Sequence, residues 1–216
     1  MKRAYGSATS NDIPELVLES GSYDALTKFR ESEEPPMDFA KEKIYTIEDI
    51  YALPDGQRAE LIDGQMYMMA PPTTIHQRIS YTVARKISDY IDKNDGSCEI
   101  FLAPFAVFLN KDDRNYVEPD ISVICDKDKL DEKGCNGAPD WIIEVTSPSN
   151  PQNDYGIKLF KYRTSGVREY WIINPQKNSI MVYDLEEGKK SNQYTFEDDV
   201  PACIYEDLSI CISKIL

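Results

Sequence analysis

Apolar and polar positions follow two different periods along the chain, and the change between them predicts the order of the elements. Residues 59–62 and 65–69 are apolar-rich runs separated by Asp63-Gly64, a pair typical of β-hairpin turns. From Thr74 to about Lys93, apolar residues recur every three or four positions, which predicts a long helix. The stretch from Thr46 to Asp49 resembles a capping box and predicts a short helix before the hairpin.

Apolar runs in the second half of the chain predict further strands around one more helix. The strands are expected within residues 98–109, 116–125, 140–147, 168–175 and 179–185, and two more are expected after residue 194. The helix is expected over 154–166, where Gly166 would provide a left-handed cap. This order predicts an α/β (α+β) domain, a mixed sheet flanked by helices, over residues 43–216. Residues 1–42, acidic and interrupted by Pro35-Pro36, are expected to form an N-terminal appendage that is partly flexible.

Composition and charge narrow the classes of function. The net charge of −14 disfavours a protein that coats nucleic acid without specificity, yet it permits an acidic site for a divalent cation. No apolar run approaches the roughly 20 residues of a membrane span, and no secretory signal is expected. The five cysteines form no CxxC pair, which indicates free thiols, a cytoplasmic location and no zinc site.

Two acids occur on neighbouring predicted strands. Asp120 opens the run ISVIC, and Glu144 lies inside DWIIEVTS, where an unpaired buried carboxylate would be costly. If the two strands pair, both carboxylates lie at the same end of the sheet. In a strand, Glu144 and Thr146 would then point to one face, and Ile143 to the other. Mg²⁺ would relieve the repulsion between two such acids and gain oxygen ligands.

Two basic residues could complete this site. Lys158 shares a helix face with Tyr162, where it could orient a water molecule or neutralise developing charge. The alternative is a surface lysine paired with Asp154 at i,i+4 spacing. His76, the only histidine, lies on the same helix side as Ile79, so it is either a core or capping residue or a residue that lines the site.

Several separate motifs, in the right order, resemble one known family. The strings are RAELIDGQMYMMAPPTTIHQRIS, VEPDISVIC, APDWIIEVTSPSN and DYGIKLFKYRTSGVREYWIINP. They are similar to the Uma-type family of putative restriction endonucleases, a former domain of unknown function within the PD-(D/E)xK nuclease superfamily. The resemblance covers residues 44–185 and leaves the N-terminal segment aside.

The resemblance implies a restriction-endonuclease-like core and a set of site residues. Asp120 of the Pro119-Asp120 motif and Glu144 would hold the metal, and Glu60 would assist directly or through water. Thr146 stands where the superfamily has a lysine, and Lys158 would take over that role from the following helix. His76 and Thr146 are residues that could line the site.

The activity implied is Mg²⁺- or Mn²⁺-dependent hydrolysis of phosphodiester bonds in DNA, leaving a 5′-phosphate. DNA would be the partner, with no membrane association, and a homodimer is allowed. Two alternatives stay open. Thr146 and the charge of −14 favour an inactive nuclease-fold binding module, and the acidity would also permit a metal-dependent hydrolase of a smaller substrate.

Overall fold

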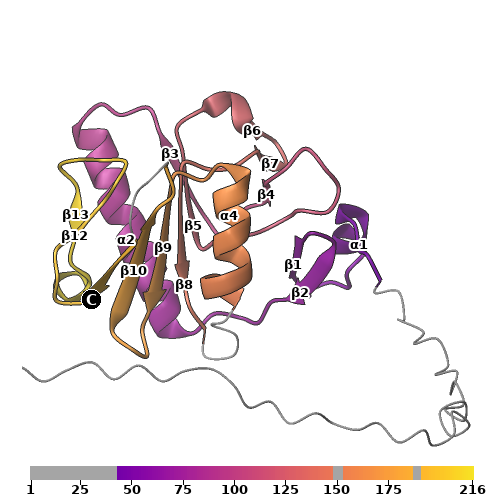
Figure 1. Cartoon of the computed structure of the whole chain (residues 1–216), viewed down its shortest axis with the longest axis horizontal. Helices are drawn as coiled ribbons and strands as arrows, with labels where there is room; N and C mark the ends of the chain where they lie inside the picture. Colours follow the sequence, from indigo (N-terminus) through magenta and orange to yellow (C-terminus); the bar gives the residue numbers. More distant parts are fainter. Residues whose placement is uncertain (1–42, 148–152, 187–190) are drawn as a thin grey trace, which may run out of the picture. The chain divides into compact units, whose positions relative to one another are not determined.

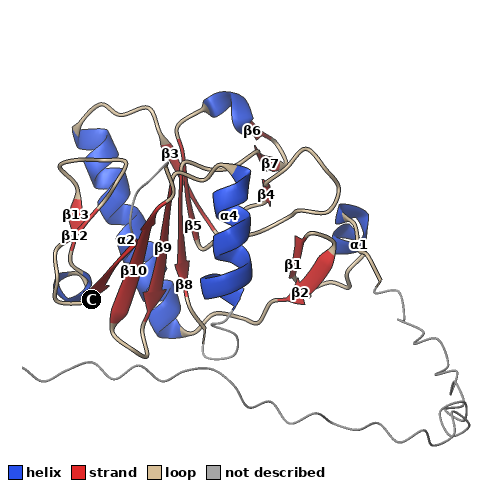
Figure 2. Cartoon of the chain, viewed as in Figure 1, coloured by secondary structure: helices blue, strands red, loops and turns tan. Residues whose placement is uncertain are grey.

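A six-stranded mixed β-sheet forms the centre of the domain (Figures 1 and 2). The computed structural model describes residues 43–147, 153–186 and 191–216, so the predicted appendage of residues 1–42 lies outside them. The strands run in the order β11-β10-β9-β8-β5-β3, and all neighbours are antiparallel except β8 and β9. Their bounds are β3 Glu99–Leu102, β5 Ile121–Ile124, β8 Trp141–Val145, β9 Glu169–Asn174, β10 Ser179–Asp184 and β11 Ser191–Thr195.

Helices cover both faces of the sheet (Figure 1). The long predicted helix is present as α2 (Thr74–Lys93), and on the other face lies α4 (Leu159–Ser165), which Gly166 ends in the expected left-handed conformation. Because β8 and β9 are parallel, the chain must cross over between them, and α4 belongs to that crossover. The predicted helix differs at its start, where η2 (Asp154–Lys158) is a π-helical turn, a wider form that is frequent at functional sites.

Alternate residues of the central strands pack against the two helices. Ile143 belongs to the apolar cluster on the α2 face, whereas Ile142 packs in the cluster that contains Tyr162 of α4. Trp141 and Trp171 are fully buried with their rings edge to face at 5.0 Å, as expected for core aromatic residues. The sheet is therefore apolar on both faces, so polar functional side chains are expected at its ends.

A separate hairpin carries the first acidic motif. It consists of β1 (Ala59–Ile62) and β2 (Gln65–Met68), with the short helix α1 (Ile47–Tyr51) beside it. Both turn residues have positive φ, 50° at Asp63 and 81° at Gly64, as a tight hairpin turn requires. An isolated β-bridge between Leu61 and Tyr116 joins the hairpin to the segment that leads into β5.

Short elements complete the described chain. The segment 98–109, predicted as one strand, is two, because Pro104 cannot donate a hydrogen bond to a sheet. None of the helices within the described ranges has the length and apolar character needed to cross a membrane. The remaining elements are β4 (Val107–Phe108), η1 (Lys127–Lys129), β6 (Leu130–Asp131), β7 (Gly134–Asn136), β12 (Val200–Pro201), β13 (Ser209–Ile210) and η3 (Ile212–Lys214).

One disulfide corrects the expectation of five free thiols. Cys98 and Cys125 are bonded to each other, whereas Cys135 and Cys211 are free thiols. The two bonded residues lie one position beyond the paired residues Glu99 and Ile124, so the antiparallel register of β3 and β5 brings them opposite each other. Spacing along the sequence could not show this, because the register is set by packing between strands 27 residues apart.

Replacing Cys98 and Cys125 together by serine should destabilise the oxidised protein. Closing a loop of 27 residues restricts the unfolded chain and is worth about 3 kcal/mol, or roughly 10 °C in melting temperature. Thermal melts with and without a reductant measure this difference. The reductant should lower the melting temperature of the unchanged protein and leave the double variant unaffected; equal melting of the unchanged protein under both conditions would contradict the disulfide.

Candidate active site

A cavity of about 380 Å³ lies where β5 begins and β8 ends. Its lining comes from the hairpin and the segment after it, the first turn of α2, the start of β5, the end of β8 and the π-helical turn. All four residues expected to be catalytic line this cavity, namely Glu60, Asp120, Glu144 and Lys158. His76 lines it as well.

The register of β5 and β8 brings the two expected metal ligands together. Ile121 pairs with Ile143, so Asp120 and Glu144 follow as the next residues on the two antiparallel strands. The Asp120 amide donates to Glu144 Oε2 at 3.4 Å, and the Val145 amide donates to Asp120 Oδ2 at 2.8 Å. Backbone amides thus hold both carboxylates, which lie at the same end of the sheet as strand pairing predicted.

Lys158 lies among three carboxylates of the cavity. Its Nζ lies 2.9 Å from Glu144 Oε1, 2.7 Å from Glu60 Oε2 and 3.8 Å from an oxygen of Asp154. The side chain is only 8% exposed, which excludes the alternative of a solvated surface lysine. Thr146 is buried and is not among the residues that line the cavity, so its predicted place there is not supported.

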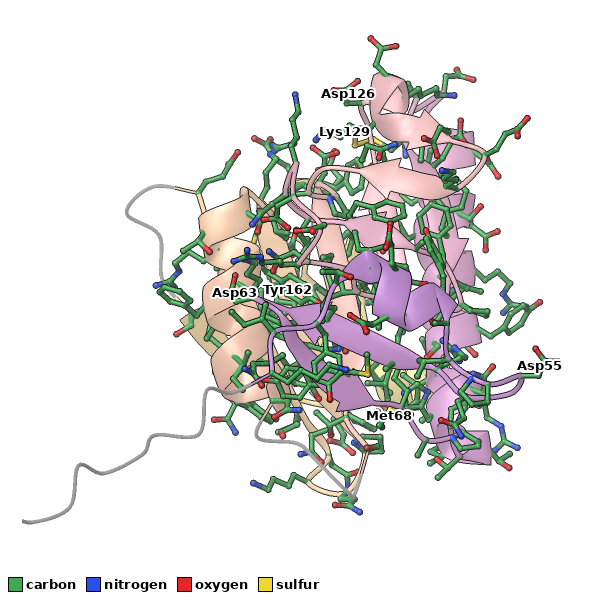
Figure 3. All side chains as sticks on the ribbon, turned by 90° about the vertical axis from the view of Figure 1, so that its right-hand side faces the viewer. Asp55, Asp63, Met68, Asp126, Lys129 and Tyr162 are labelled. Atoms are coloured by element: carbon green, nitrogen blue, oxygen red, sulfur yellow. A yellow bond between two sulfur atoms is a disulfide. The ribbon has the colours of Figure 1, made fainter. Side chains whose placement is uncertain are left out.

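Glu60 comes from the hairpin and is held by contacts at both ends. Its Oε1 accepts a hydrogen bond from the Glu118 amide at 3.0 Å, and its Oε2 contacts Lys158. At the hairpin turn, Asp63 forms an ion pair with Lys161 of α4 at 2.5 Å. Figure 3 shows Asp63 beside the helix that carries Tyr162, with Met68 at the opposite end of the hairpin.

His76 contacts Asp120 from the first turn of α2. The Thr73 side chain caps this helix by accepting from the His76 amide, and the ring points its Nε2 to within 3.0 Å of Asp120 Oδ2. Burial acts to lower the pKa of His76, but the hydrogen bond and the charge of Asp120 outweigh it and raise that pKa. The histidine is therefore a cavity residue that favours its charged form beside a carboxylate.

Carboxylates outnumber cations in this cavity. Among the described lining residues the acids are Glu60, Glu118, Asp120, Glu144 and Asp154, and the bases are Arg58, His76 and Lys158. Burial and the neighbouring acids raise the pKa of Glu144 well above its usual value, against the opposing charge of Lys158. Burial likewise raises the pKa of Asp154 to about 6. Burial alone would lower the Lys158 pKa, yet the surrounding carboxylates hold it well above normal.

The donor set fits a hard divalent cation held mainly by two carboxylates. Among the described residues, no three acidic, histidine or cysteine side chains are grouped as a metal centre. Mg²⁺ commonly uses one or two protein carboxylates and keeps water in its other positions, so a pair is sufficient. Asp120 Oδ1 accepts no hydrogen bond from a described residue, and Glu144 Oε2 accepts only the long one from the Asp120 amide. These two oxygens are the available ligands.

Sequence reasoning missed several polar residues at the site. Tyr162 donates to Glu144 Oε1 at 2.8 Å, and its spacing of four from Lys158 was the available signal. Asp154 lines the cavity and belongs to the Lys158 cluster, although its i,i+4 spacing suggested only a surface pair. Arg58 and Glu118 bond to each other beside Glu60, and no sequence spacing indicates a contact between residues 60 positions apart.

With this geometry established, comparison with known proteins identifies the family. The family model described as "Uma2: Putative restriction endonuclease" matches residues 47–208, about three quarters of the chain. The chain belongs to this family. The motifs that suggested the resemblance fall within the matched region, and so do all the cavity residues described above.

Two individual proteins are similar to this chain. The uncharacterized protein slr1290 of Synechocystis sp. (strain ATCC 27184 / PCC 6803 / Kazusa) is 27% identical over 128 residues, which are 59% of this chain and 66% of that relative. A crystal structure of a putative nuclease belonging to DUF820 from Anabaena variabilis ATCC 29413 matches with a TM-score of 0.64 and 21% identity. It covers 79% of this chain and 96% of the other. The restriction-endonuclease-like fold expected from the sequence is confirmed.

Replacing Asp154 by asparagine should make stability less dependent on pH. Because the pKa of Asp154 is raised to about 6 in the folded protein, the folded state binds its proton more tightly than the unfolded chain does. This carboxyl therefore lowers stability as pH rises from about 4 to about 6, by at most about 3 kcal/mol. Melts of both proteins in EDTA should differ least at pH 4 and most above pH 6. A difference that stays constant across this range would contradict the raised pKa.

Proposed function

We propose that this protein is a divalent-metal-dependent endonuclease that hydrolyses phosphodiester bonds in DNA. The observation that carries the proposal is the convergence of Asp120, Glu144 and Lys158 in one cavity, with the lysine amine 2.9 Å from Glu144. Membership of a family of putative restriction endonucleases supports the same reaction class. The product expected from the resemblance is a 5′-phosphate and a 3′-hydroxyl.

Asp120 and Glu144 are the residues that would hold Mg²⁺ or Mn²⁺. When bound, such an ion polarises a phosphoryl oxygen and lowers the pKa of a coordinated water. The cation would also be required for substrate binding. Its fixed carboxylates would repel the phosphates of a nucleic acid, so substrate binding is expected to depend on the metal.

Lys158 and Glu60 are assigned to the attacking water and the charge that develops on phosphorus. Glu60 and Glu144 hold the amine from two sides, so it is already oriented before substrate enters. In the hydrolysis, the water oxygen gives up a proton and bonds to phosphorus, the bond to the 3′ oxygen breaks, and that oxygen takes up a proton. His76, with its raised pKa, is a proton donor within the cavity.

A catalytically inactive binding module is the competing function, because the chain carries a net charge of −14 and the cavity more acids than bases. The two functions differ in turnover. We expect cleavage of supercoiled plasmid DNA with Mg²⁺ or Mn²⁺ and none with EDTA. Single-stranded DNA and RNA assayed in parallel decide the polymer preference. Binding without cleavage of any of the three would support the module.

Replacing Asp120 by asparagine should reduce the rate of this cleavage by about a hundred- to a thousandfold, a loss typical of removing a group that stabilises transition-state charge. The matched control is Asp89→Asn, which removes the same charge from an exposed position on α2. Gel assays of both variants at equal protein concentration provide the comparison. Equal loss of activity in both, or full activity in the Asp120 variant, would contradict the assignment of Asp120 as a metal ligand.

Metal binding should also be visible without any substrate. Mn²⁺ relieves the repulsion among the buried carboxylates, so it should raise the melting temperature of the unchanged protein and of Asp89→Asn. At roughly ten times its dissociation constant, the gain is about 1.4 kcal/mol. The Asp120→Asn variant should show no such shift. If the unchanged protein shows no shift at millimolar Mn²⁺, the metal-dependent mechanism is wrong.

A further inference from the structure

Arg58 differs from the other cations of the cavity in how its charge is balanced. Among the described lining residues, Lys158 contacts three carboxylates and His76 contacts Asp120. Arg58 contacts one carboxylate, that of Glu118, and its side chain is 36% exposed. Nε, at 2.7 Å, and Nη2 both donate to the same oxygen, Glu118 Oε2. Nη1 forms no hydrogen bond with any described residue, so its N–H groups are available to bind a ligand.

The guanidinium is held in a fixed position next to the catalytic acids. Arg58 and Glu60 are two residues apart at the start of β1, so their side chains leave the strand on the same face, toward the cavity. Its partner Glu118 lies two residues before Asp120. The second oxygen of Glu118 accepts from the Tyr116 hydroxyl at 2.6 Å, which fixes the carboxylate that orients the arginine.

An apolar wall lies directly beside this arginine. The Arg58 carbonyl accepts from the Met69 amide at 2.8 Å, so the pairing of the two hairpin strands continues to the cavity edge. The consecutive residues from Met68 to Pro72 line the cavity next to it. A cation and an apolar wall side by side match the two parts of a nucleotide, which are an anionic phosphate and a sugar and base with apolar faces.

We propose that Arg58 forms a phosphate-binding subsite for the nucleic-acid backbone next to the metal ligands, with Glu118 as its positioning residue. The wall from Met68 to Pro72 receives the adjoining sugar or base. This inference rests on the proposed nuclease function and names how its substrate is held. Arginine suits the role because its planar fork can bind a carboxylate with one edge and a phosphate with another.

A purely structural ion pair is the competing explanation, and steady-state kinetics separate the two. The substrates are a single-stranded DNA oligonucleotide and the small diester bis(4-nitrophenyl) phosphate, with Mn²⁺ in excess. For Arg58→Gln we expect KM to rise about tenfold on the oligonucleotide, as when one charge-assisted contact is lost, with a smaller change in kcat. Arg58→Lys keeps the charge without the fork and should recover part of the lost affinity.

A binding measurement without turnover gives an independent reading. A fluorescent oligonucleotide with phosphorothioate linkages keeps the backbone charge and is hydrolysed slowly, so its anisotropy reports affinity with Mg²⁺ at several salt concentrations. Losing one phosphate contact should reduce the slope of log affinity against log salt by about 0.7. The matched control is Arg85→Gln, which removes an exposed arginine near Tyr81 on α2, outside the cavity.

The outcomes distinguish failure of this subsite from failure of the nuclease function. A raised KM and a reduced slope in Arg58→Gln only, with its Mn²⁺ melting shift unchanged, supports the subsite. An Arg58→Gln protein that melts lower but keeps KM and slope shows a structural ion pair and overturns it. If the unchanged protein hydrolyses the small diester but neither the oligonucleotide nor plasmid DNA, the DNA substrate is wrong and the subsite is overturned with it. If the unchanged protein neither binds nor hydrolyses any of these substrates, both proposals are overturned.

Discussion

The buried amine of Lys158 holds together the parts of this site that come from different regions of the chain. It contacts Glu60 from the hairpin and Glu144 from the central strand, while its own backbone belongs to the crossover after that strand. Taking such charges out of water costs several kcal/mol, and the geometry must be nearly ideal to offset that cost. Removing Lys158 would leave Glu60 and Glu144 without the cation that they share, and removing either acid would leave the amine with one carboxylate fewer. These buried charges therefore contribute little to the stability of the fold, and their role is in the site.

Negative charge in excess of this one lysine gives the site its chemical character. Burial and mutual repulsion raise the pKa of Glu144 and Asp154, so the cavity is a poor environment for ionised acids unless more positive charge is present. In the proposed function, a divalent cation would supply that charge, and the same cation would make the cavity acceptable to a phosphate. The acidity of the chain, which by itself argues against nucleic acid, is thereby consistent with a metal-dependent enzyme.

Local patterns in the sequence predicted the elements and the pairing of the two metal-ligand candidates. Asp63-Gly64 indicated the hairpin turn, and the alternation within β8 indicated that Glu144 and Ile143 face opposite sides. These features depend on residues close in sequence. The Arg58–Glu118 contact and the disulfide do not, because each depends on which strands become neighbours and in what register. The π-helical start of the crossover was also missed, since helical periodicity does not separate it from an α-turn.

The hairpin that supplies Glu60 is a two-stranded sheet separate from the central one. Its strands pair with each other, and within the described residues its β-type contact with the remainder of the chain is the single bridge from Leu61 to Tyr116. Opening it would break few backbone hydrogen bonds, whereas separating Asp120 from Glu144 would require dismantling the central sheet. The site thus combines a rigid half with one of lower local stability. In hydrogen exchange, the hairpin amides would therefore lose protection before those of β8.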